Sequence, residues 1–428
     1  MNNNQQFYGQ YNGQPMQPKK DKSGKYFGFG LFAGIVLTTL VVFGLVLTGR
    51  LANLLMDDTA GLGKDVSSEE TAITIEMVQK LELIEDIIDK YFYKENIDRE
   101  VLAEGAFRGM VDALGDPYST YYSYEELLEL YSDSAGVYYG IGAYVSIDEA
   151  TSYPMISGVI SGAPAEEADL RANDIVYKVN GKDVYGMTLE EVVSLIKGEE
   201  GTKVNLTLVR DGVEIEKEVV RRKVEKDTVT HEIYDNGIAY IQITEFDTVT
   251  ESEFKEAMTD AKAADAKGII IDLRSNPGGN LSTVNNIARQ LLPKGLITYT
   301  VDRDGKRQEY TCDGRNEIQI PLVVLIDGNS ASASEILAGA IKDYGIGTLV
   351  GTTTYGKGIV QRPIEMTDGS AVKLTISTYY TPNGNNVHGE GITPDIEVKF
   401  DSERYYSDEK YDNQKEEAIK ILLDMIEE

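Results

Sequence analysis

Residues 321–336 have the sequence PLVVLIDGNSASASEI, in which an apolar segment, Pro321–Asp327, precedes a Gly-Asn turn and three serines at alternate positions. The pattern predicts a buried strand, a tight turn and the first turn of a helix. A serine at such a junction is held by rigid elements, and its hydroxyl faces the edge of the sheet beside free helix amides. That position suits a nucleophile, but Ser332 and Glu335 also match a helix capping box.

Strands and helices alternate around this junction, from Thr228 to the C-terminus. The expected strands are 238–243, 268–273 and 321–327, and the expected helices are 251–263, 281–292 and 332–343. Such alternation predicts an α/β domain with a largely parallel sheet. The last segment, 413–426, is an amphipathic helix that either docks on this domain or pairs with a second copy.

A lysine between two glycines follows 25 residues after Ser332, in the sequence GTTTYGKG at 351–358. This sequence matches a phosphate-binding loop except at its last position, where glycine replaces the hydroxyl that binds magnesium. A phosphate loop also precedes a helix, whereas residues 359–363 are expected to be extended. Lys357 is either a solvated side chain or, behind apolar strands, a desolvated amine whose lowered pKa suits a general base.

The segment Leu273–Gly279, LRSNPGG, follows another apolar strand and is called the glycine loop below. Amides of paired glycines can approach a ligand closely enough to form an oxyanion hole, and the same pair also suits a tight turn.

Composition excludes several classes of protein. The 428 residues carry a formal charge of −30, which repels phosphate backbones, so no nucleic acid is expected as a partner. One cysteine, Cys312, cannot form an internal disulfide or a zinc cluster, so any metal would need mostly carboxylate ligands. No metal and no cofactor are expected, because a desolvated lysine can replace both metal and histidine. With only His231 and His388 available, a hydrolase is expected to use a base other than histidine.

The N-terminal region predicts a membrane anchor. Residues 1–25 form an expected disordered cytoplasmic tail that ends in lysines, and residues 26–49 contain no charge. As a helix, 26–49 is about 36 Å long, enough to cross a hydrocarbon core of about 30 Å. A buried core helix and a cleaved signal peptide are the alternatives. The lysines predict a single-pass protein of the cell membrane whose N-terminus is cytoplasmic, with a stalk at 50–70 and an extracytoplasmic body.

Three further segments make up that body. Apolar residues at helical spacing predict a helical subdomain over 71–130. Short strands with one helix, 188–197, then predict a compact module over 131–222. The α/β domain occupies 223–428.

Five motifs together resemble those of the carboxyl-terminal processing peptidases, also called tail-specific proteases. They are DALGDPYSTYY (112–122), LRSNPGG (273–279), SASASEI (330–336), YGKGIVQ (355–361) and HGEGITPDI (388–396). The resemblance covers about residues 81–400. It implies a serine endopeptidase whose α/β domain has the ClpP/crotonase fold and carries an inserted PDZ domain.

The resemblance also implies a catalytic set. In that family the middle serine of the run is the nucleophile, the glycine-flanked lysine is the base, and a glutamine four residues later supports the lysine; these positions are Ser332, Lys357 and Gln361. The amides of Ala333 and Gly278 would form the oxyanion hole.

The module at 131–222 resembles the PDZ domain of the family, in which backbone amides hold a peptide's C-terminus while the peptide adds a strand to the sheet. The implied carboxylate-binding loop is Tyr139, Gly140, Ile141, Gly142 and Ala143, and the implied groove residues are Leu189, Val192, Val193 and Ile196. Asn173 stands where relatives carry glycine, and asparagine tolerates left-handed geometry. Arg171 contacts bound peptide, acts as a gate, or is solvated, and Asp343 matches an acidic position that we interpret as structural support.

The sequence thus predicts a single-pass membrane serine protease that captures unstructured, apolar C-terminal tails of proteins and cleaves them with a Ser/Lys dyad. The alternative is a membrane-tethered PDZ adaptor that binds peptides without cutting them. A homodimer is expected because dimers are common in the family.

Overall fold

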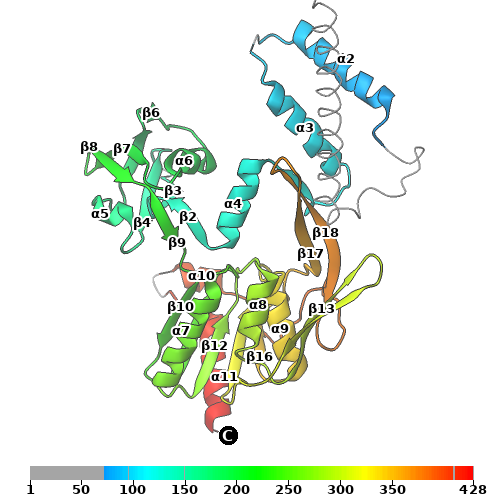
Figure 1. Cartoon of the computed structure of the whole chain (residues 1–428). Coiled ribbons are helices and arrows are strands. Elements are labelled where there is room, and N and C mark those ends of the chain that lie inside the picture. Colours follow the sequence, from blue (N-terminus) through cyan, green and yellow to red (C-terminus); the bar gives the residue numbers. More distant parts are fainter. Residues whose placement is uncertain (1–71, 95, 149, 408–409, 428) are drawn as a thin grey trace, which may run out of the picture. The chain divides into compact units, whose positions relative to one another are not determined.

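The computed structural model describes residues 72–94, 96–148, 150–407 and 410–427 (Figure 1). The chain divides into two units, Met1–Ile97 and Asp98–Glu428. The expected membrane span at 26–49, with its tail and stalk, lies outside the described residues. Within the described ranges, no helix combines the length and the apolar character that crossing a membrane requires.

The first unit contributes one described helix, α2 (Ile75–Tyr91). It begins where the side chain of Thr74 accepts the amide of Met77, and it lies within the segment 71–130 that the sequence predicts to be helical. The second unit opens with α3 (Arg99–Asp112), capped by Asp98, and continues with a helix α4 (Tyr124–Ser134).

The middle module is an antiparallel sheet of order β3-β4-β5-β7-β8, with β6 paired to β5. Its elements are β3 (Ala143–Ile147), β4 (Pro154–Val159), α5 (Pro164–Glu167), β5 (Ile175–Val179), β6 (Lys182–Asp183), α6 (Leu189–Ile196), β7 (Lys203–Arg210) and β8 (Val213–Val220). The sequence predicts short strands at 142–147, 155–159, 175–179 and 204–210 and a helix at 188–197, which correspond to β3, β4, β5, β7 and α6. The sequence does not predict β8, because glutamates and a lysine alternate along that strand and only one of its residues is fully buried.

A two-stranded ribbon joins this module to the rest of the unit, and we call it the stalk ribbon. It consists of β2 (Val137–Gly140) and β9 (Arg222–Glu225), which pair antiparallel. The chain therefore enters the middle module through β2 and leaves it through β9, and these two strands pair with each other.

The α/β domain is built on a six-stranded sheet of order β10-β11-β12-β15-β16-β19, parallel except for β10. Its strands are β10 (Val229–Ile233), β11 (Ile238–Ile243), β12 (Gly268–Asp272), β15 (Leu322–Ile326), β16 (Thr348–Gly351) and β19 (Ile396–Glu397). Its helices are α7 (Thr250–Ala263), α8 (Leu281–Ala288), α9 (Ala333–Tyr344), α10 (Ser402–Tyr406) and α11 (Asn413–Glu427). The predicted alternation of strands and helices is confirmed.

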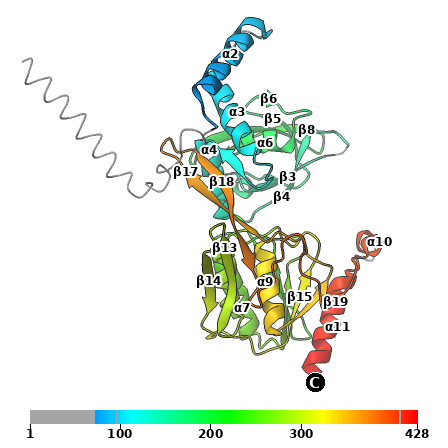
Figure 2. The same ribbon diagram turned by 90° about the vertical axis from the view of Figure 1, so that its right-hand side faces the viewer.

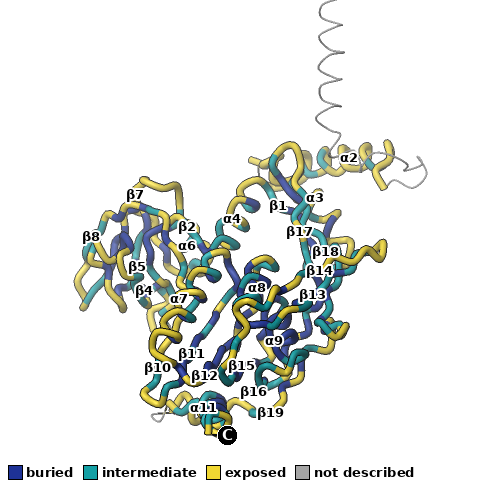
Figure 3. Tube along the Cα trace, turned by 60° about the horizontal axis from the view of Figure 1, so that its bottom comes forward, coloured by how far each residue is buried: buried dark blue, intermediate teal, exposed yellow. Residues whose placement is uncertain are grey.

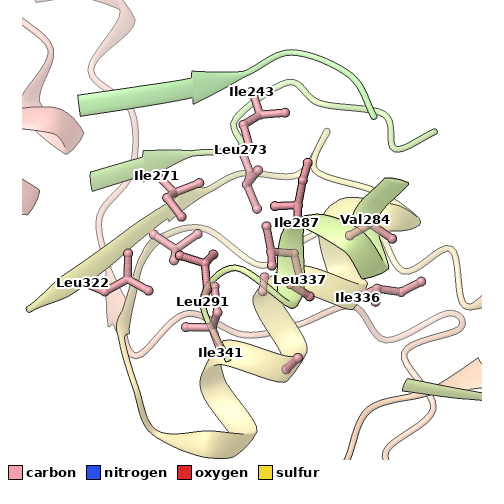
Figure 4. Packing of buried hydrophobic residues seen from close by; sticks show 14 of the residues in the cluster. Ile243, Ile271, Leu273, Val284, Ile287, Leu291, Leu322, Ile336, Leu337 and Ile341 are labelled. Atoms are coloured by element: carbon pink, nitrogen blue, oxygen red, sulfur yellow. The ribbon is translucent and has the colours of Figure 1, made fainter. Parts of the chain in front are cut away.

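Helices cover both faces of this sheet, which explains its continuous apolar strands. Ile269 and Ile271 of β12 pack in the cluster formed with α7, α8 and α9, whereas Ile270 packs with Ala418 and Leu422 of α11. Figure 2 shows α9 and α11 on opposite sides of β15, Figure 3 shows buried residues gathered along the central strands, and Figure 4 shows the larger cluster. The terminal helix therefore docks on its own domain.

A second sheet, which the sequence did not predict, has the order β1-β18-β13-β14, with β17 also paired to β18. Its strands are β1 (Thr120–Tyr122), β13 (Gly295–Asp302), β14 (Arg307–Cys312), β17 (Ile359–Glu365) and β18 (Ala371–Tyr380). Because β1 pairs with β18, the segment before the middle module belongs to this sheet. The pairing brings residues 120–122 to β18, whose other neighbour at this point is β17, the strand that follows Lys357.

Candidate active site

The three serines of the SASAS run have different surroundings at the junction of β15 and α9. Ser330 Oγ donates to the Leu273 carbonyl at 2.8 Å, and Ser334 Oγ donates to the Asn276 carbonyl at 3.0 Å. Both are fully buried and bind the junction to the glycine loop. Ser332 is half-buried and lines a cavity. Of the three hydroxyls, that of Ser332 is the one open to a substrate.

The backbone of Ser332 is strained, with φ 53° and ψ −110°. A non-glycine residue rarely adopts a positive φ, and such strain, about 1–3 kcal/mol, persists where surrounding contacts impose it. Here Ser332 N donates to Glu335 Oε2 at 2.8 Å, and the hydroxyl of Tyr379 donates to the Ser332 carbonyl at 3.0 Å. The serine is therefore fixed through both its amide and its carbonyl.

One buried carboxylate, Glu335, joins this junction to the loop that carries Lys357. Its Oε2 accepts the amides of Ser332 and Lys357, both at 2.8 Å. Its Oε1 accepts the amide of Gly356 at 2.7 Å and the hydroxyl of Thr354 at 2.6 Å. These four donors stabilise a charge that is fully buried. Glu335 thus occupies the position expected for a capping box and also sets the spacing between the two candidate catalytic residues.

The glycines beside Lys357 are required by close packing against a second loop. A Cβ on Gly358 would lie 2.5 Å from His388 N, and one on Gly356, whose φ is +88°, would lie 3.1 Å from Gly391 N. A side chain at Gly358 would therefore push the lysine away. The loop continues into β17 and not into a helix, so the phosphate-loop interpretation is excluded.

Lys357 has the electrostatic surroundings of a base. Burial lowers the pKa of Lys357, and the ammonium of Lys373 lowers it further, whereas the carboxylates of Asp116 and Glu335 act in the opposite direction. The ring of Tyr118 lies 4.6 Å from the lysine nitrogen, a contact that favours the charged form. The net effect is a lowered pKa for Lys357, as expected for a desolvated amine.

Ser332 and Gln361 line the same cavity, whereas Lys357 is not among the described residues that line it, and its nitrogen lies over the ring of Tyr118. Among the described residues, no hydrogen bond joins Ser332 Oγ to Lys357 Nζ. Gln361 lines the cavity beside Ser332, and its amide donates to Thr375 Oγ1 at a long 3.4 Å. Catalytic hydrogen bonds are often long before substrate binds and tighten in the complex.

Asp116 is a residue of this site to which the sequence analysis gave no role. Its Oδ2 accepts the hydroxyl of Ser119 at 2.6 Å and that of Thr375 at 2.7 Å, so it connects to Gln361 through Thr375. Burial raises the pKa of Asp116, but these hydrogen bonds outweigh burial and lower the pKa. Only the motif at 112–122 singled out this segment in the sequence.

The glycine loop lies against the serine, as an oxyanion hole requires. Gly278 has φ +111°, and a Cβ there would lie 2.8 Å from Ser332 Cβ and 3.0 Å from Ala333 N. However, the Gly278 amide already donates to Asn276 Oδ1 at 2.9 Å. In this conformation Gly278 is therefore not a free oxyanion donor. Among the described hydrogen bonds, none engages the amide of Ala333 or that of Gly279, which lines the cavity.

The cavity beside Ser332 has a volume of about 160 Å³. Its apolar lining comes from Leu281, Ile336, Ile359 and Val360. Asn280, Ser332, Gln361 and Tyr379 add polar groups to the lining, and a cavity of this size can hold one small or medium side chain of a peptide.

The expected peptide-binding residues of the middle module divide into two groups. Val192 and Ile196, at 0% and 5% exposure, pack in the core of the module with Ile141, so they do not line an open groove here. The physical reason is helical spacing, because positions four apart on α6 share the face turned to the sheet. Leu189 and Val193 are the α6 residues of the expected set that remain accessible.

The expected carboxylate-binding loop is partly strand. Tyr139 and Gly140 pair with Lys223 and Arg222 in the stalk ribbon, and Ala143 begins β3. Gly142 has φ +73°, and a Cβ there would meet Ala163 at 2.2 Å, so glycine is required at this turn.

Three other residues named from the sequence have structural contacts. Arg171 pairs with Asp169 at 2.8 Å on the surface. Asp343 accepts the amide of Asn383 at 2.8 Å, which supports the turn after β18. Asn173 adopts φ 73°, the left-handed geometry that asparagine tolerates.

Three family models match the chain. The model described as peptidase family S41 matches residues 237–398, which include Ser332, Lys357 and Gln361. A PDZ domain model matches residues 155–210, and a model described as activating protease CtpB N-terminal domain matches residues 51–126.

Similar proteins of known name cover most of this chain. The carboxy-terminal processing protease CtpA of Bacillus subtilis (strain 168) is 38% identical over 318 residues, which are 74% of this chain and 67% of that protein. CtpB of the same organism is 35% identical over 314 residues, 72% of this chain and 65% of that protein. The matches thus span about two thirds of the relatives' own length. Among solved structures, a photosystem II D1 C-terminal processing protease is 30% identical, with a TM-score of 0.46, and the match covers 76% of this chain and 94% of that one.

Proposed function

The chain belongs to peptidase family S41, among the PDZ-containing carboxy-terminal processing serine proteases, and on this premise we propose that it is a membrane-anchored endopeptidase that captures protein C-termini and cleaves them with a Ser332/Lys357 dyad. The observation that carries the proposal is the difference among the three serines. Ser330 and Ser334 are buried and bonded inward, while Ser332 is open to the cavity.

The proposed reaction uses only groups of this chain. Neutral Lys357 accepts the proton of Ser332 Oγ as that oxygen attacks the peptide carbonyl. The amide of Ala333, together with one glycine amide, stabilises the oxyanion. Protonated Lys357 then donates to the leaving amine, and water releases the acyl group from Ser332. The lowered pKa of Lys357 supports the first step, because it raises the fraction of neutral amine near neutral pH.

The choice between Gly278 and Gly279 as the second oxyanion donor depends on Asn276. Gly278 can serve if its amide leaves Asn276 Oδ1 when substrate binds, whereas the amide of Gly279 needs no such exchange. Gly279 is therefore our preferred donor in the conformation described.

The substrate class follows from the two binding regions. The PDZ domain would hold the free C-terminus of an unstructured tail as an added strand, with Leu189 and Val193 beside it. The cavity next to Ser332, whose lining is partly polar and partly apolar, would hold one side chain of the same protein near the scissile bond. The substrates we propose are proteins with unstructured, apolar C-terminal tails.

Anchoring and assembly are proposed from the sequence and from family habit. Residues 26–49 would form the single membrane span, with the protease on the extracytoplasmic side. The apolar face of α11 docks on its own domain through Ala418 and Leu422, so this helix gives no support for a dimer. The proposed homodimer is supported only by the frequency of dimers in the family.

The test is cleavage of an unfolded reporter with an apolar C-terminus by the full-length protein in detergent, between pH 6 and 10. We expect Ser332→Ala and Lys357→Ala to abolish cleavage without lowering the melting temperature. His388→Ala, near the lysine loop, is the matched control and should retain activity, because no histidine acts as base. Binding without cleavage by the unmodified protein would instead favour the PDZ adaptor, and cleavage by Lys357→Ala would mean that another group is the base.

A further inference from the structure

The segment 116–119, which precedes the PDZ domain in the chain, binds the side chain and the backbone of Thr375 on β18. Asp116 Oδ2 accepts the hydroxyl of Thr375 at 2.7 Å. Ser119 Oγ, which is buried, donates to the same carboxylate oxygen at 2.6 Å and accepts the amide of Thr375 at 3.1 Å. Thr375 is therefore held at both its amide and its hydroxyl.

Thr375 lies directly opposite Gln361 in the pairing of β17 with β18. Residues that oppose each other on neighbouring strands direct their side chains to the same face of the sheet, and here Gln361 Nε2 donates to Thr375 Oγ1 at 3.4 Å. The register shifts between Val360 and Gln361, and such irregularities re-aim side chains beside active sites. The pairing thus places the threonine hydroxyl next to a glutamine that lines the cavity with Ser332.

The single proton of the Thr375 hydroxyl determines which way the Gln361 amide faces. Burial raises the pKa of Asp116, but the hydrogen bonds from Ser119 and Thr375 outweigh burial and lower the pKa, so the carboxylate is ionised. An ionised carboxylate only accepts, so Thr375 gives its proton to Asp116. Thr375 Oγ1 is left to accept, and from Gln361 it can accept only the NH₂ group. The carbonyl oxygen of Gln361 then remains available, and none of the described hydrogen bonds engages it.

The orientation of this amide matters to Lys357, four residues earlier. A neutral amine has two N–H groups and one lone pair, and a general base needs the lone pair for the proton of Ser332. A carbonyl oxygen accepts an N–H of the lysine and leaves the lone pair free, and it also stabilises the ammonium that forms. An NH₂ group in its place would donate to the lone pair and occupy it. Only one of the two amide orientations therefore supports the base.

We propose that Thr375 and Asp116 are positioning residues that fix the Gln361 amide in the orientation that supports Lys357. The inference rests on the proposed function, because the orientation matters only where Lys357 acts as base. Asp116 takes the threonine proton, Thr375 takes the amide NH₂ group, and the glutamine carbonyl is left for the lysine. In the conformation described, Lys357 Nζ lies over the ring of Tyr118, so Gln361 is oriented before the lysine turns to the serine.

The decisive variant is Thr375→Val, which keeps the β-branched shape and removes the hydroxyl. Thr375→Ser restores the hydroxyl, and Thr311→Val, at an exposed position of β14 in the same sheet, is the matched control. Rates are measured with the full-length protein and an unfolded reporter that has an apolar C-terminus. We expect Thr375→Val to lower kcat about two- to tenfold, the effect of one hydrogen bond, with KM little changed. Thr375→Ser should regain most of the rate, and Thr311→Val should keep all of it.

A double-mutant cycle with Gln361→Ala shows whether Thr375 acts through the glutamine. In the Gln361→Ala background, Thr375→Val should have no further effect on kcat. Where cleavage is too slow to follow, the rate at which a fluorophosphonate labels Ser332 supplies the same cycle. An equal loss in both backgrounds, or no recovery in Thr375→Ser, would overturn the positioning role of Thr375.

Asp116→Asn is a second variant of nearly the same shape. Its NH₂ group can donate to Thr375 Oγ1, so the threonine proton turns to Gln361 and the amide reverses. The plateau value of kcat should therefore fall at least as far as in Thr375→Val. An undiminished plateau would overturn the role of Asp116.

The pH profile separates this role from a contribution to folding alone. The groups that face Lys357 are the ammonium of Lys373, the ring of Tyr118 and the carboxylates of Asp116 and Glu335. Burial lowers the pKa of Lys357, and the Asp116 carboxylate opposes that shift. Asp116→Asn should therefore move the rising, acid-side limb of the pH–kcat/KM profile to lower pH. A fixed limb together with a lower melting temperature would assign Asp116 to the fold alone.

Failure of the inference and failure of the function give different results. If the unmodified protein cleaves no reporter, the proposed function fails, and the positioning role fails with it. If the unmodified protein cleaves and Thr375→Val retains full kcat, only the positioning role fails.

Discussion

The amide of Lys357 lies 2.8 Å from Oε2 of Glu335, the same oxygen that accepts the amide of Ser332. A single carboxylate therefore holds together the backbones of the proposed nucleophile and the proposed base. In Glu335→Gln, an NH₂ group replaces one oxygen and leaves at least one loop donor without an acceptor. We expect kcat to fall about 100-fold or more, because small misplacements of catalytic groups are costly, and unfolding free energy to fall by about 1–3 kcal/mol.

Steady-state kinetics and urea unfolding of the same preparation check this expectation. Glu256→Gln, an exposed position on α7, is the control and should change neither quantity. A destabilised Glu335→Gln protein with undiminished kcat would show that Glu335 supports the fold without positioning the dyad.

Lys373 offers a test of the base through charge alone. Because its ammonium lowers the pKa of Lys357, Lys373→Met should raise that pKa and reduce the fraction of neutral lysine at pH 7. The rising, acid-side limb of the pH–kcat/KM profile, which follows deprotonation of Lys357, should therefore move to higher pH, with activity several-fold lower at pH 7 and recovered above the new limb. Tyr122→Phe removes the 2.8 Å hydrogen-bond partner of Lys373 without changing charge and should leave the limb in place. A limb that stays fixed in Lys373→Met would argue against Lys357 as the titrating group.

Asp247 should make stability depend on pH. Burial, followed by the charge of Glu245, raises the pKa of Asp247 from 3.8 to about 7, although Lys226 acts against the shift. The folded protein then holds a proton between about pH 4 and 7 that the unfolded chain releases, so this contribution to stability is full below pH 4 and is lost as pH rises through 7.

We expect Asp247→Asn to flatten the stability profile over this range and to raise the unfolding free energy at pH 8 by about 1–3 kcal/mol, because Oδ2 of the aspartate is buried without a partner. Urea unfolding at pH 5, 6, 7 and 8 measures it, with the exposed Asp235→Asn as control. A parallel loss of stability for Asp247→Asn at every pH would contradict the prediction.

Two neighbouring positions on α6 should separate peptide binding from stability. Leu189, 38% exposed, is available to a ligand, whereas Val192 is fully buried in the module's core. Leu189→Ala should weaken binding of an apolar C-terminal peptide several-fold while leaving the melting temperature unchanged. Val192→Ala should instead lower the unfolding free energy by about 1–3 kcal/mol, since it creates a cavity. Peptide titration and thermal unfolding of both variants decide whether the groove lies along this helix.

The part of the site that local sequence predicts is the junction at Ser332. An apolar strand, a turn and a helix start are adjacent in the chain, so periodicity and turn chemistry were enough to locate the serine and Glu335. The glycines around Lys357 are equally visible in the sequence. The need for glycine at position 358 is not, because it comes from the close tertiary contact of Gly358 with His388.

The contribution of Asp116 could not be predicted from such patterns. It depends on the pairing of β1 with β18, and most residues of β18 are half-buried, so no clear alternation marks the strand. Helical spacing on α6 likewise predicts an apolar face, but it does not distinguish residues that pack in the core of the module from residues that are accessible to a peptide. Val192 serves the core of the module, and only the structure distinguishes it from Leu189.

The hydrogen bond between Asp116 and Thr375 joins residues 259 positions apart, with the whole PDZ domain between them. Synthesis runs from the N-terminus, so the strands from β3 to β8 are all available long before β17 and β18 emerge. Pairing over so long a loop is also slow. The strands of the PDZ domain are therefore available to pair well before β17 and β18, and we expect the contacts around Lys357 to form late.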